Sequence, residues 1–203
     1  MIKNIIFDFG DVFINLDKEA TYRELAKLGI TEITEDMMQQ YFQYEMGLIS
    51  TDSFINYFNT KFNISKEELI RSWNAILLDF PLHRLEFLKE LNASKKYRLF
   101  LLSNTNELHI SWIQNDWGME LYNEFKSCFE QFYLSHEIKM RKPNSNIFEF
   151  VLNENNLQAK ETIFIDDTQE NTDAAKELGI HVWNNNPLTE DVIELLNRKE
   201  FVA

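Results

Sequence analysis

Two short apolar segments that each stop at an aspartate constrain the fold of this chain more than any other feature. Residues 5–7 (Ile-Ile-Phe) precede Asp8, and residues 163–165 (Ile-Phe-Ile) precede Asp166 and Asp167. Short β-branched runs of this kind are typical of strands buried on both faces, as in parallel sheets. Open α/β sheets bind ligands at the carboxyl edge of their strands, so we expect three carboxylates to gather at one such edge.

Strand and helix patterns alternate along the chain after Pro81. This alternation predicts right-handed βαβ crossovers and therefore a parallel α/β sheet. Pro143 stands just ahead of one predicted helix and Gly179 just after another. Proline is favoured at the start of helices and glycine directly after their end. The predicted strands are residues 98–102, 129–134 and 180–183, and the predicted helices are residues 85–91, 108–117, 144–155 and 171–178.

The segment between about residues 18 and 85 has a different character, because its apolar residues recur only at helical spacing. Thr34, Ser50 and Ser65 are candidate N-caps, and Glu68 completes a capping box with Ser65. We find no strand pattern there. The sequence therefore predicts a cluster of four helices inserted after the first strand.

Charge and composition limit the possible partners. The formal net charge is −13 and no long Lys/Arg cluster occurs, so neither nucleic acid nor an anionic membrane surface is an expected partner. The single cysteine, Cys128, precludes an intrachain disulfide and is read as a small buried hydrophobe, which fits a reducing compartment. No signal-peptide layout and no apolar run of the roughly 18 residues that a membrane span needs is present, so we expect a soluble cytoplasmic protein.

The aspartates suggest metal and phosphate chemistry. A strand-end carboxylate such as Asp8 is weakly nucleophilic, but beside a divalent cation and a lysine it can attack phosphorus. Helix capping explains Asp8 alone equally well. Adjacent carboxylates such as Asp166 and Asp167 repel each other unless a cation lies between them, and Mg²⁺ suits such hard oxygen ligands. The alternative is a solvated pair in a turn.

Two further segments could hold a phosphate. Ser103 and Asn104 follow an apolar strand, where a hydroxyl and free backbone N–H groups can bind an anion. Lys142 precedes Pro143, which restricts it to extended conformations and would direct it out of a loop as a point charge. We interpret the neighbouring Arg141 as a surface residue. The four histidines lack metal-ligand spacing and are read as structural or exposed.

Taken in order, these motifs resemble the haloacid dehalogenase (HAD) superfamily of phosphohydrolases. The resemblance runs from Phe7 to Gly179, and the four motifs are specific as an ordered set although each is loose alone. Local similarity points to the branch that contains α-glucose-1-phosphatase-like and epoxide-hydrolase-N-domain-like phosphatases. It lies in residues 13–17, 45–50, 142–148 and 166–171.

The resemblance implies a Rossmann-like catalytic core, residues 1–16 and 85–203, with an inserted four-helix cap, residues 17–84. It implies that Asp8 forms an aspartyl-phosphate. It implies a Mg²⁺ site made by Asp8, Asp167 and the carbonyl of Gly10, with Asp166 helping directly or through water. It assigns phosphate binding to Ser103, the Asn104 backbone and Lys142.

Gly10 is a departure from the family pattern. Most phosphatases of the family carry a second aspartate at this position as general acid and base, although members of the resembled branch also have glycine. Losing a general acid can cost roughly 10²–10⁴ in rate. Asp11 and Asp17 are the nearest carboxylates in sequence; we favour Asp11 because it is closest to the nucleophile, although a shift of one residue changes side-chain direction.

These observations predict a Mg²⁺-dependent hydrolase of small phosphomonoesters, with sugar phosphates as a candidate class. The expected partner is a small phosphorylated metabolite, and the oligomeric state stays open. One alternative is a metal-free 2-haloacid dehalogenase that uses Asp8 on carbon, a branch that typically lacks the paired Asp166 and Asp167. The other is a catalytically weak or regulatory protein, which Gly10 would favour.

Overall fold

The computed structural model describes residues 1–201 and contains a five-stranded parallel sheet in the order β3-β2-β1-β4-β5. This order places β1 in the middle of the sheet, between β2 and β4. The predicted class, an α/β fold with a parallel sheet and an inserted helical segment, is confirmed. The strands are β1 (Asn4–Phe7), β2 (Arg98–Ser103), β3 (Gln131–Leu134), β4 (Thr162–Asp166) and β5 (His181–Asn184).

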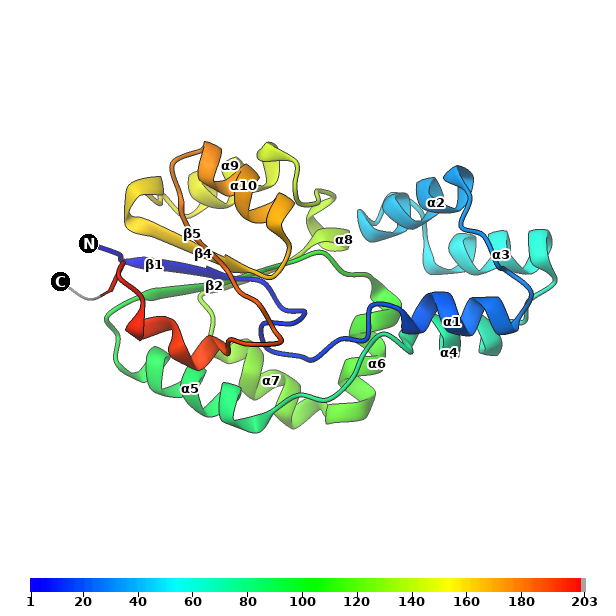
Figure 1. Cartoon of the computed structure of the whole chain (residues 1–203), viewed down its shortest axis with the longest axis horizontal. Coiled ribbons are helices and arrows are strands. Elements are labelled where there is room, and N and C mark those ends of the chain that lie inside the picture. The colour runs from blue at the N-terminus through cyan, green and yellow to red at the C-terminus, as the bar shows by residue number, and fades with distance from the viewer. Residues whose placement is uncertain (202–203) are drawn as a thin grey trace.

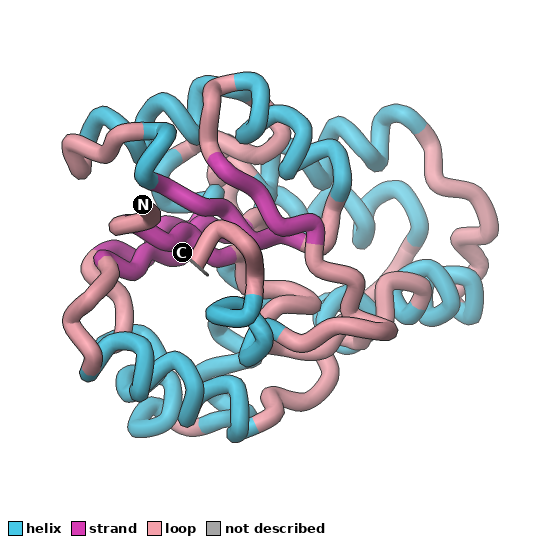
Figure 2. The backbone as a smooth tube through the Cα atoms, turned by 60° about the vertical axis from the view of Figure 1, so that its left-hand side comes forward, coloured by secondary structure: helices cyan, strands magenta, loops and turns pink. Residues whose placement is uncertain are grey.

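Helices cover both faces of the sheet, which explains why its strands are continuous apolar runs (Figures 1 and 2). One face packs against α9 (Ser145–Glu154) and α10 (Gln169–Glu177). The other packs against α5 (Leu82–Ala93), α6 (Glu107–Trp117), α7 (Met119–Ser127) and the 3₁₀ helix η2 (Val192–Asn197).

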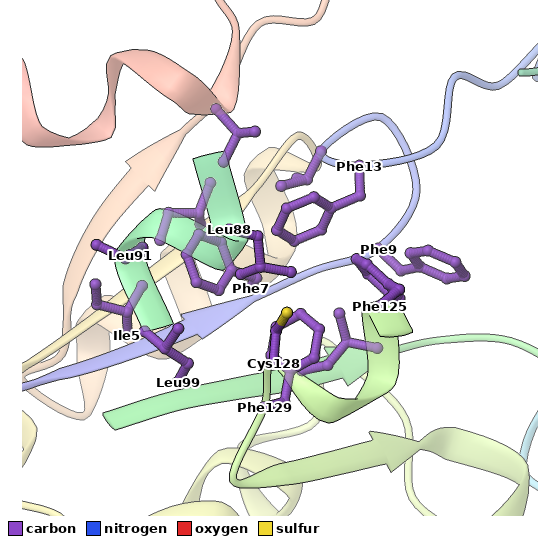
Figure 3. Close-up of a cluster of buried hydrophobic side chains, with 14 of the residues drawn as sticks. Ile5, Phe7, Phe9, Phe13, Leu88, Leu91, Leu99, Phe125, Cys128 and Phe129 are labelled. Carbon is purple, nitrogen blue, oxygen red and sulfur yellow. The ribbon is translucent and has the colours of Figure 1, made fainter. Parts of the chain in front are cut away.

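Alternate residues of β1 enter opposite halves of the core. Ile5 and Phe7 belong to the cluster under α5 and α7, whereas Ile6 belongs to the cluster under α9 and α10. Figure 3 shows the first of these clusters, in which Phe7 and Phe129 pack near Cys128. Cys128 is buried, as predicted.

Four helices separate β1 from α5 in the chain: α1 (Ala20–Lys27), α2 (Glu35–Glu45), α3 (Thr51–Phe62) and α4 (Lys66–Asn74). They lie beyond the carboxyl ends of the strands (Figure 1). They have their own apolar cluster, centred on Phe54, Phe58 and Trp73. Their predicted N-caps are confirmed, because Thr34, Ser50 and Ser65 each accept a hydrogen bond from a first-turn backbone N–H.

Four short elements escaped the sequence patterns: α7, α8 (Ser135–Ile138), the 3₁₀ helix η1 (Ala159–Glu161) and the 3₁₀ helix η2. Gly118, with φ of 79°, separates α6 from α7, so the helix predicted over residues 108–117 corresponds to α6 alone. Within residues 1–201, no helix combines the length and the apolar character that crossing a bilayer requires.

Candidate active site

The strand order brings three polar strand ends together. Phe7 of β1 is in register with Leu101 of β2 and Ile165 of β4. Asp8 directly follows β1, while Ser103 and Asp166 are the last residues of β2 and β4. From β1 the chain adds β2 and β3 on one side, and then crosses over to add β4 and β5 on the other side. The strand order therefore reverses between the neighbouring strands β1 and β4, and α/β folds bind ligands at such a topological switch point.

Lys142 joins two of the carboxylates. Its Nζ lies 2.7 Å from Asp8 Oδ1 and 2.7 Å from Asp166 Oδ2, and its side chain is only 1% exposed. Asn104 fixes the backbone of this lysine, because its side-chain amide accepts from Lys142 N and donates to Lys142 O, both at 2.9 Å. The Asn104 side chain therefore positions the lysine, a contact that the sequence motif alone did not indicate.

Asp8, Asp166 and Asp167 form an acidic cluster in which one carboxylate oxygen from each lies within 4.8 Å of the others. Asp166 is held by the backbone N–H of Thr168 at 2.7 Å and by Asn171 Nδ2 at 2.9 Å. Asp167 forms an ion pair with Lys18. No histidine or cysteine joins this cluster in the described part of the chain.

Burial controls the electrostatics of this cluster. Burial raises the pKa of Asp8 to about 7; Lys142 opposes the rise, and repulsion by Asp166 and Asp167 adds to it. Burial also raises the pKa of Asp167, against the pull of Lys18. Burial lowers the pKa of Lys142, but the carboxylates of Asp166 and Asp8 outweigh it and the net shift is upward. Lys142 is therefore a permanent cation, and a further cation would favour the charged form of the carboxylates.

A cavity of about 380 Å³, here called the catalytic cavity, opens above this edge of the sheet. This volume lies within the range of small-molecule sites. The sheet side contributes six of the predicted site residues: Asp8, Gly10, Ser103, Asn104, Lys142 and Asp167. The helical insert contributes Tyr41, Phe42 and Glu45 to the opposite wall. Asp166 is fully buried beneath the cavity.

Asp11, one of the two candidate general acids, is engaged elsewhere. Its Oδ1 accepts from the backbone N–H of Leu16 at 3.0 Å, and its Oδ2 lies 3.2 Å from Lys18 Nζ. Among residues 1–201, the walls of the catalytic cavity include Gly10 but not Asp11. The geometry therefore argues against Asp11 as the group that protonates a leaving group.

Asp17, the other candidate, lies outside these walls as well and forms an ion pair with Arg23, in which Nη2 and Oδ2 are 2.5 Å apart. In this structure, neither Asp11 nor Asp17 lines the catalytic cavity beside Gly10.

Arg141 was predicted to be a surface residue, and this is wrong. Its Nε donates to Glu45 Oε2 at 2.6 Å, and its guanidinium lies 4.3 Å from the centroid of the Phe42 ring. Glu45 is almost fully buried and also accepts from the Tyr41 hydroxyl. Arg141 and Glu45 lie 96 positions apart in the sequence, so no local sequence pattern could predict that they pair.

His109 of α6 is a second wall residue that the sequence did not single out. Its Nδ1 lies 2.9 Å from Asn74 Oδ1 of α4, and its ring stacks on Trp73. Burial lowers the pKa of His109 to about 3. The ring is therefore neutral at neutral pH, and donation from Nδ1 to Asn74 leaves Nε2 as an acceptor.

Comparison with known proteins adds independent information. The family model described as haloacid dehalogenase-like hydrolase matches residues 5–184. A D-ribitol-5-phosphate phosphatase of Bacteroides thetaiotaomicron is 29% identical over 191 residues, which span 90% of this chain and 91% of that protein. A sesquiterpene phosphatase of Aspergillus oryzae is 23% identical over 192 residues, with 88% and 87% covered.

Solved structures agree with this comparison. A HAD family enzyme of Bacteroides thetaiotaomicron, in an aspartate-to-alanine variant solved with magnesium and inorganic phosphate, superposes with a TM-score of 0.84. It is 34% identical, and the match covers 98% of this chain and 100% of that one.

Proposed function

Because the chain belongs to the haloacid dehalogenase-like hydrolase family, we propose that it is a magnesium-dependent phosphatase of small phosphomonoesters. One observation carries the proposal: a buried lysine bridges the strand-end carboxylates of Asp8 and Asp166 at the floor of a cavity of small-molecule size. This arrangement offers a nucleophile and a fixed positive charge at one point, which phosphoryl transfer requires.

The donor set fits magnesium. Three carboxylates converge within 4.8 Å, and Mg²⁺ favours one or two carboxylates together with water and phosphate oxygens. Asp8, Asp167 and the carbonyl of Gly10 would hold the ion, with Asp166 supporting directly or through water. Bound Mg²⁺ would neutralise charge on the phosphoryl oxygens and on the carboxylates.

The chain's own residues would then divide the work. Asp8 forms a bond to phosphorus while the bond from phosphorus to the alcohol oxygen breaks, and the departing oxygen takes a proton from solvent. Water then attacks phosphorus, and cleavage of the aspartyl-phosphate bond releases inorganic phosphate and restores Asp8. Ser103, the Asn104 backbone and Lys142 hold the phosphate. In this proposal, residues 1–16 and the described residues from 85 onward make up the catalytic core, and residues 17–84 make up the cap.

Sugar and polyol phosphates are the first substrates to test, because the D-ribitol-5-phosphate phosphatase aligns over nearly its whole length. The sesquiterpene phosphatase, also aligned over most of its length, represents apolar alcohols. The lone cysteine is in keeping with a cytoplasmic location, which we also propose.

The proposal is tested with purified protein and a panel of phosphomonoesters, assayed for phosphate release in Mg²⁺ and in EDTA. We expect turnover that requires Mg²⁺ and disappears in Asp8→Asn, which keeps the shape of the side chain but removes its negative charge. Halide release from 2-chloropropionate in EDTA would instead support a dehalogenase. A folded, Mg²⁺-binding protein without turnover on any substrate would support a regulatory role.

A further inference from the structure

A second cavity lies between the inserted helices and α6, directly against the catalytic cavity. It has a volume of about 130 Å³ and is here called the cap chamber. Lys18, Tyr41, Ile76 and His109 line both cavities and form their common wall. The chamber is therefore the nearest apolar space to a phosphate bound in the catalytic cavity, with only these shared side chains between them.

The chamber is mainly apolar, in contrast to the catalytic cavity. A polyol placed there would lose water from its hydroxyls without gaining enough partners, and unpaired buried hydroxyls are costly. Carbon chains and rings have no such penalty. Its remaining walls, beyond the four shared residues, come from Thr21, Tyr22, Leu25, Ile33, Met37, Met38, Phe58 and Trp73.

A polar group in this wall lacks a partner. The indole Nε1 of Trp73 is buried and has no hydrogen-bond partner among the described residues. Buried indole N–H groups usually find an acceptor.

The size of the chamber sets the size of its occupant. Apolar cavities of about 150 Å³ take up benzene, so 130 Å³ suits one six-membered ring or a chain of about five carbons. Each methylene that such a chain buries strengthens binding about fourfold.

We propose that the cap chamber binds the apolar part of the substrate's alcohol. The preferred substrates are then phosphomonoesters of alcohols that carry a ring or a chain of about five carbons, rather than of polyols. This inference rests on the proposed phosphatase function, whose site the chamber adjoins.

A comparison of four substrates in Mg²⁺ tests the inference: methyl, pentyl and benzyl phosphate, and D-ribitol 5-phosphate. We expect kcat/KM for pentyl phosphate to exceed that for methyl phosphate by on the order of 10²-fold, since four added methylenes are buried. Ribitol 5-phosphate should fall below pentyl and benzyl phosphate, although its alcohol is the better leaving group. A flat series from methyl to pentyl, or a preference for ribitol 5-phosphate, would overturn the inference. Failure of p-nitrophenyl phosphate as well would overturn the phosphatase function itself.

Matched variants locate the effect. Met38→Gln makes the chamber wall polar at nearly constant volume, whereas Met46→Gln alters a half-buried methionine of the same segment that lines neither cavity. We expect the pentyl-to-methyl ratio to fall about tenfold in Met38→Gln and to stay unchanged in Met46→Gln. Ile33→Thr, a smaller change in the same wall, should lower the ratio in the same direction if Met38→Gln fails to fold. An unchanged ratio in a folded chamber variant would contradict the assignment.

Discussion

At the scale of single residues, the site depends on one buried cation between two carboxylates. Lys142 is almost completely inaccessible, and among residues 1–201 its ion-pair partners are Asp8 and Asp166. A buried charge that loses its partners is strongly destabilising. The same geometry that keeps Lys142 charged also holds it against the nucleophile, so stability and chemistry are coupled at this residue.

Lys142→Met keeps most of the side-chain volume but removes the charge. We expect kcat/KM for p-nitrophenyl phosphate to fall by on the order of 10²-fold or more, because electrostatic positioning dominates phosphoryl transfer. Arg141→Met is the matched control and should reduce kcat/KM much less, since Arg141 contacts Glu45 rather than the acidic cluster. Steady-state kinetics of both variants check this. Equal losses would mean that Arg141 binds the phosphate too.

Gly10 leads to a prediction about leaving groups. With no carboxylate there, the wild-type rate should depend steeply on the pKa of the departing alcohol. In Gly10→Asp, the new Cβ would lie 2.6 Å from Leu16 Cδ1, a flexible side-chain end that can move. We expect Gly10→Asp to flatten the dependence in a series of aryl and alkyl phosphates, and Gly10→Asn to leave it steep. A wild-type enzyme that is already flat would reveal another acid.

The sequence alone predicted the positions of those site residues that stand at the ends of strands. Asp8, Ser103 and Asp166 could be placed because a strand's last residue is readable from its apolar run. The pairing of Arg141 with Glu45 could not be read, since it depends on which face of α2 meets a distant loop. The two hydrogen bonds between the Asn104 side chain and the Lys142 backbone could not be predicted either, because they also join loops that are far apart in the sequence.

At the scale of elements, the contact between the ends of α2 and α8 is unusually close. Gly47 follows α2 with φ of 61°, and a Cβ built there would lie 2.0 Å from the carbonyl oxygen of His136 in α8. Only glycine fits this approach, because both the backbone conformation and the space exclude a side chain. The inserted helices therefore approach the sheet-bearing part of the chain very closely where α2 ends.

Gly47→Ala should separate these elements. We expect its free energy of unfolding to fall by roughly 2–4 kcal/mol, from the positive φ and from displaced backbone. Gly29→Ala is the control: its φ of 91° is also positive, but a Cβ there meets open space, so we expect a loss of only about 1 kcal/mol. Urea denaturation measures both. Equal losses would show that the contact with His136 relaxes without cost.

The contact between α4 and α6 should make stability depend on pH through His109. Its pKa is lowered to about 3 in the folded protein, so the unfolded chain binds a proton first as pH falls below about 6.5. Stability is thus full above pH 6.5 and is lost towards pH 3. Between pH 7.5 and 4.5 we expect a loss of roughly 2–3 kcal/mol from this group. Denaturation curves at both pH values measure how much the free energy of unfolding falls between pH 7.5 and pH 4.5. This fall should be smaller by roughly 2–3 kcal/mol in His109→Phe than in wild type. Equal falls in the two proteins would contradict the prediction.

Element by element, the sequence predicted the strands and the longer helices because their apolar periodicity is strong. The predicted helix ended at residue 117, and α7 was missed because it begins directly after Gly118, without the polar cluster that normally marks a loop between two helices. The sequence missed α8 because a helix of four residues has no periodicity to read.

At the scale of the whole molecule, the catalytic cavity has walls from both the sheet and the inserted helices. The order of motifs along the chain could predict the sheet edge, since strand ends meet there by topology. It could not predict the opposite wall, because the position of the insert depends on long-range contacts such as that between Glu45 and Arg141. The substrate's alcohol would meet that second wall, which is why substrate choice was the least predictable property.

The acidic cluster should link magnesium binding to the stability of the whole fold. The unfolded chain does not hold three carboxylates within 4.8 Å of one another, so Mg²⁺ binds the folded state and stabilises it. At about 100 times the dissociation constant the gain is about 2.7 kcal/mol, which for a chain of this size corresponds to a rise in Tm of roughly 5–10 °C.

Asp167→Asn should separate this effect from general salt stabilisation. Removing one of three clustered negative charges relieves repulsion, so the variant in EDTA should melt at or above the wild-type temperature. Its rise in Tm on adding Mg²⁺ should shrink to about 2 °C or less. Asp173→Asn, an exposed aspartate of α10, is the control and should keep the wild-type rise. Thermal melts of the three proteins, with and without Mg²⁺, decide the matter. If Asp167→Asn responds to Mg²⁺ as fully as wild type does, the ion does not bind at this cluster.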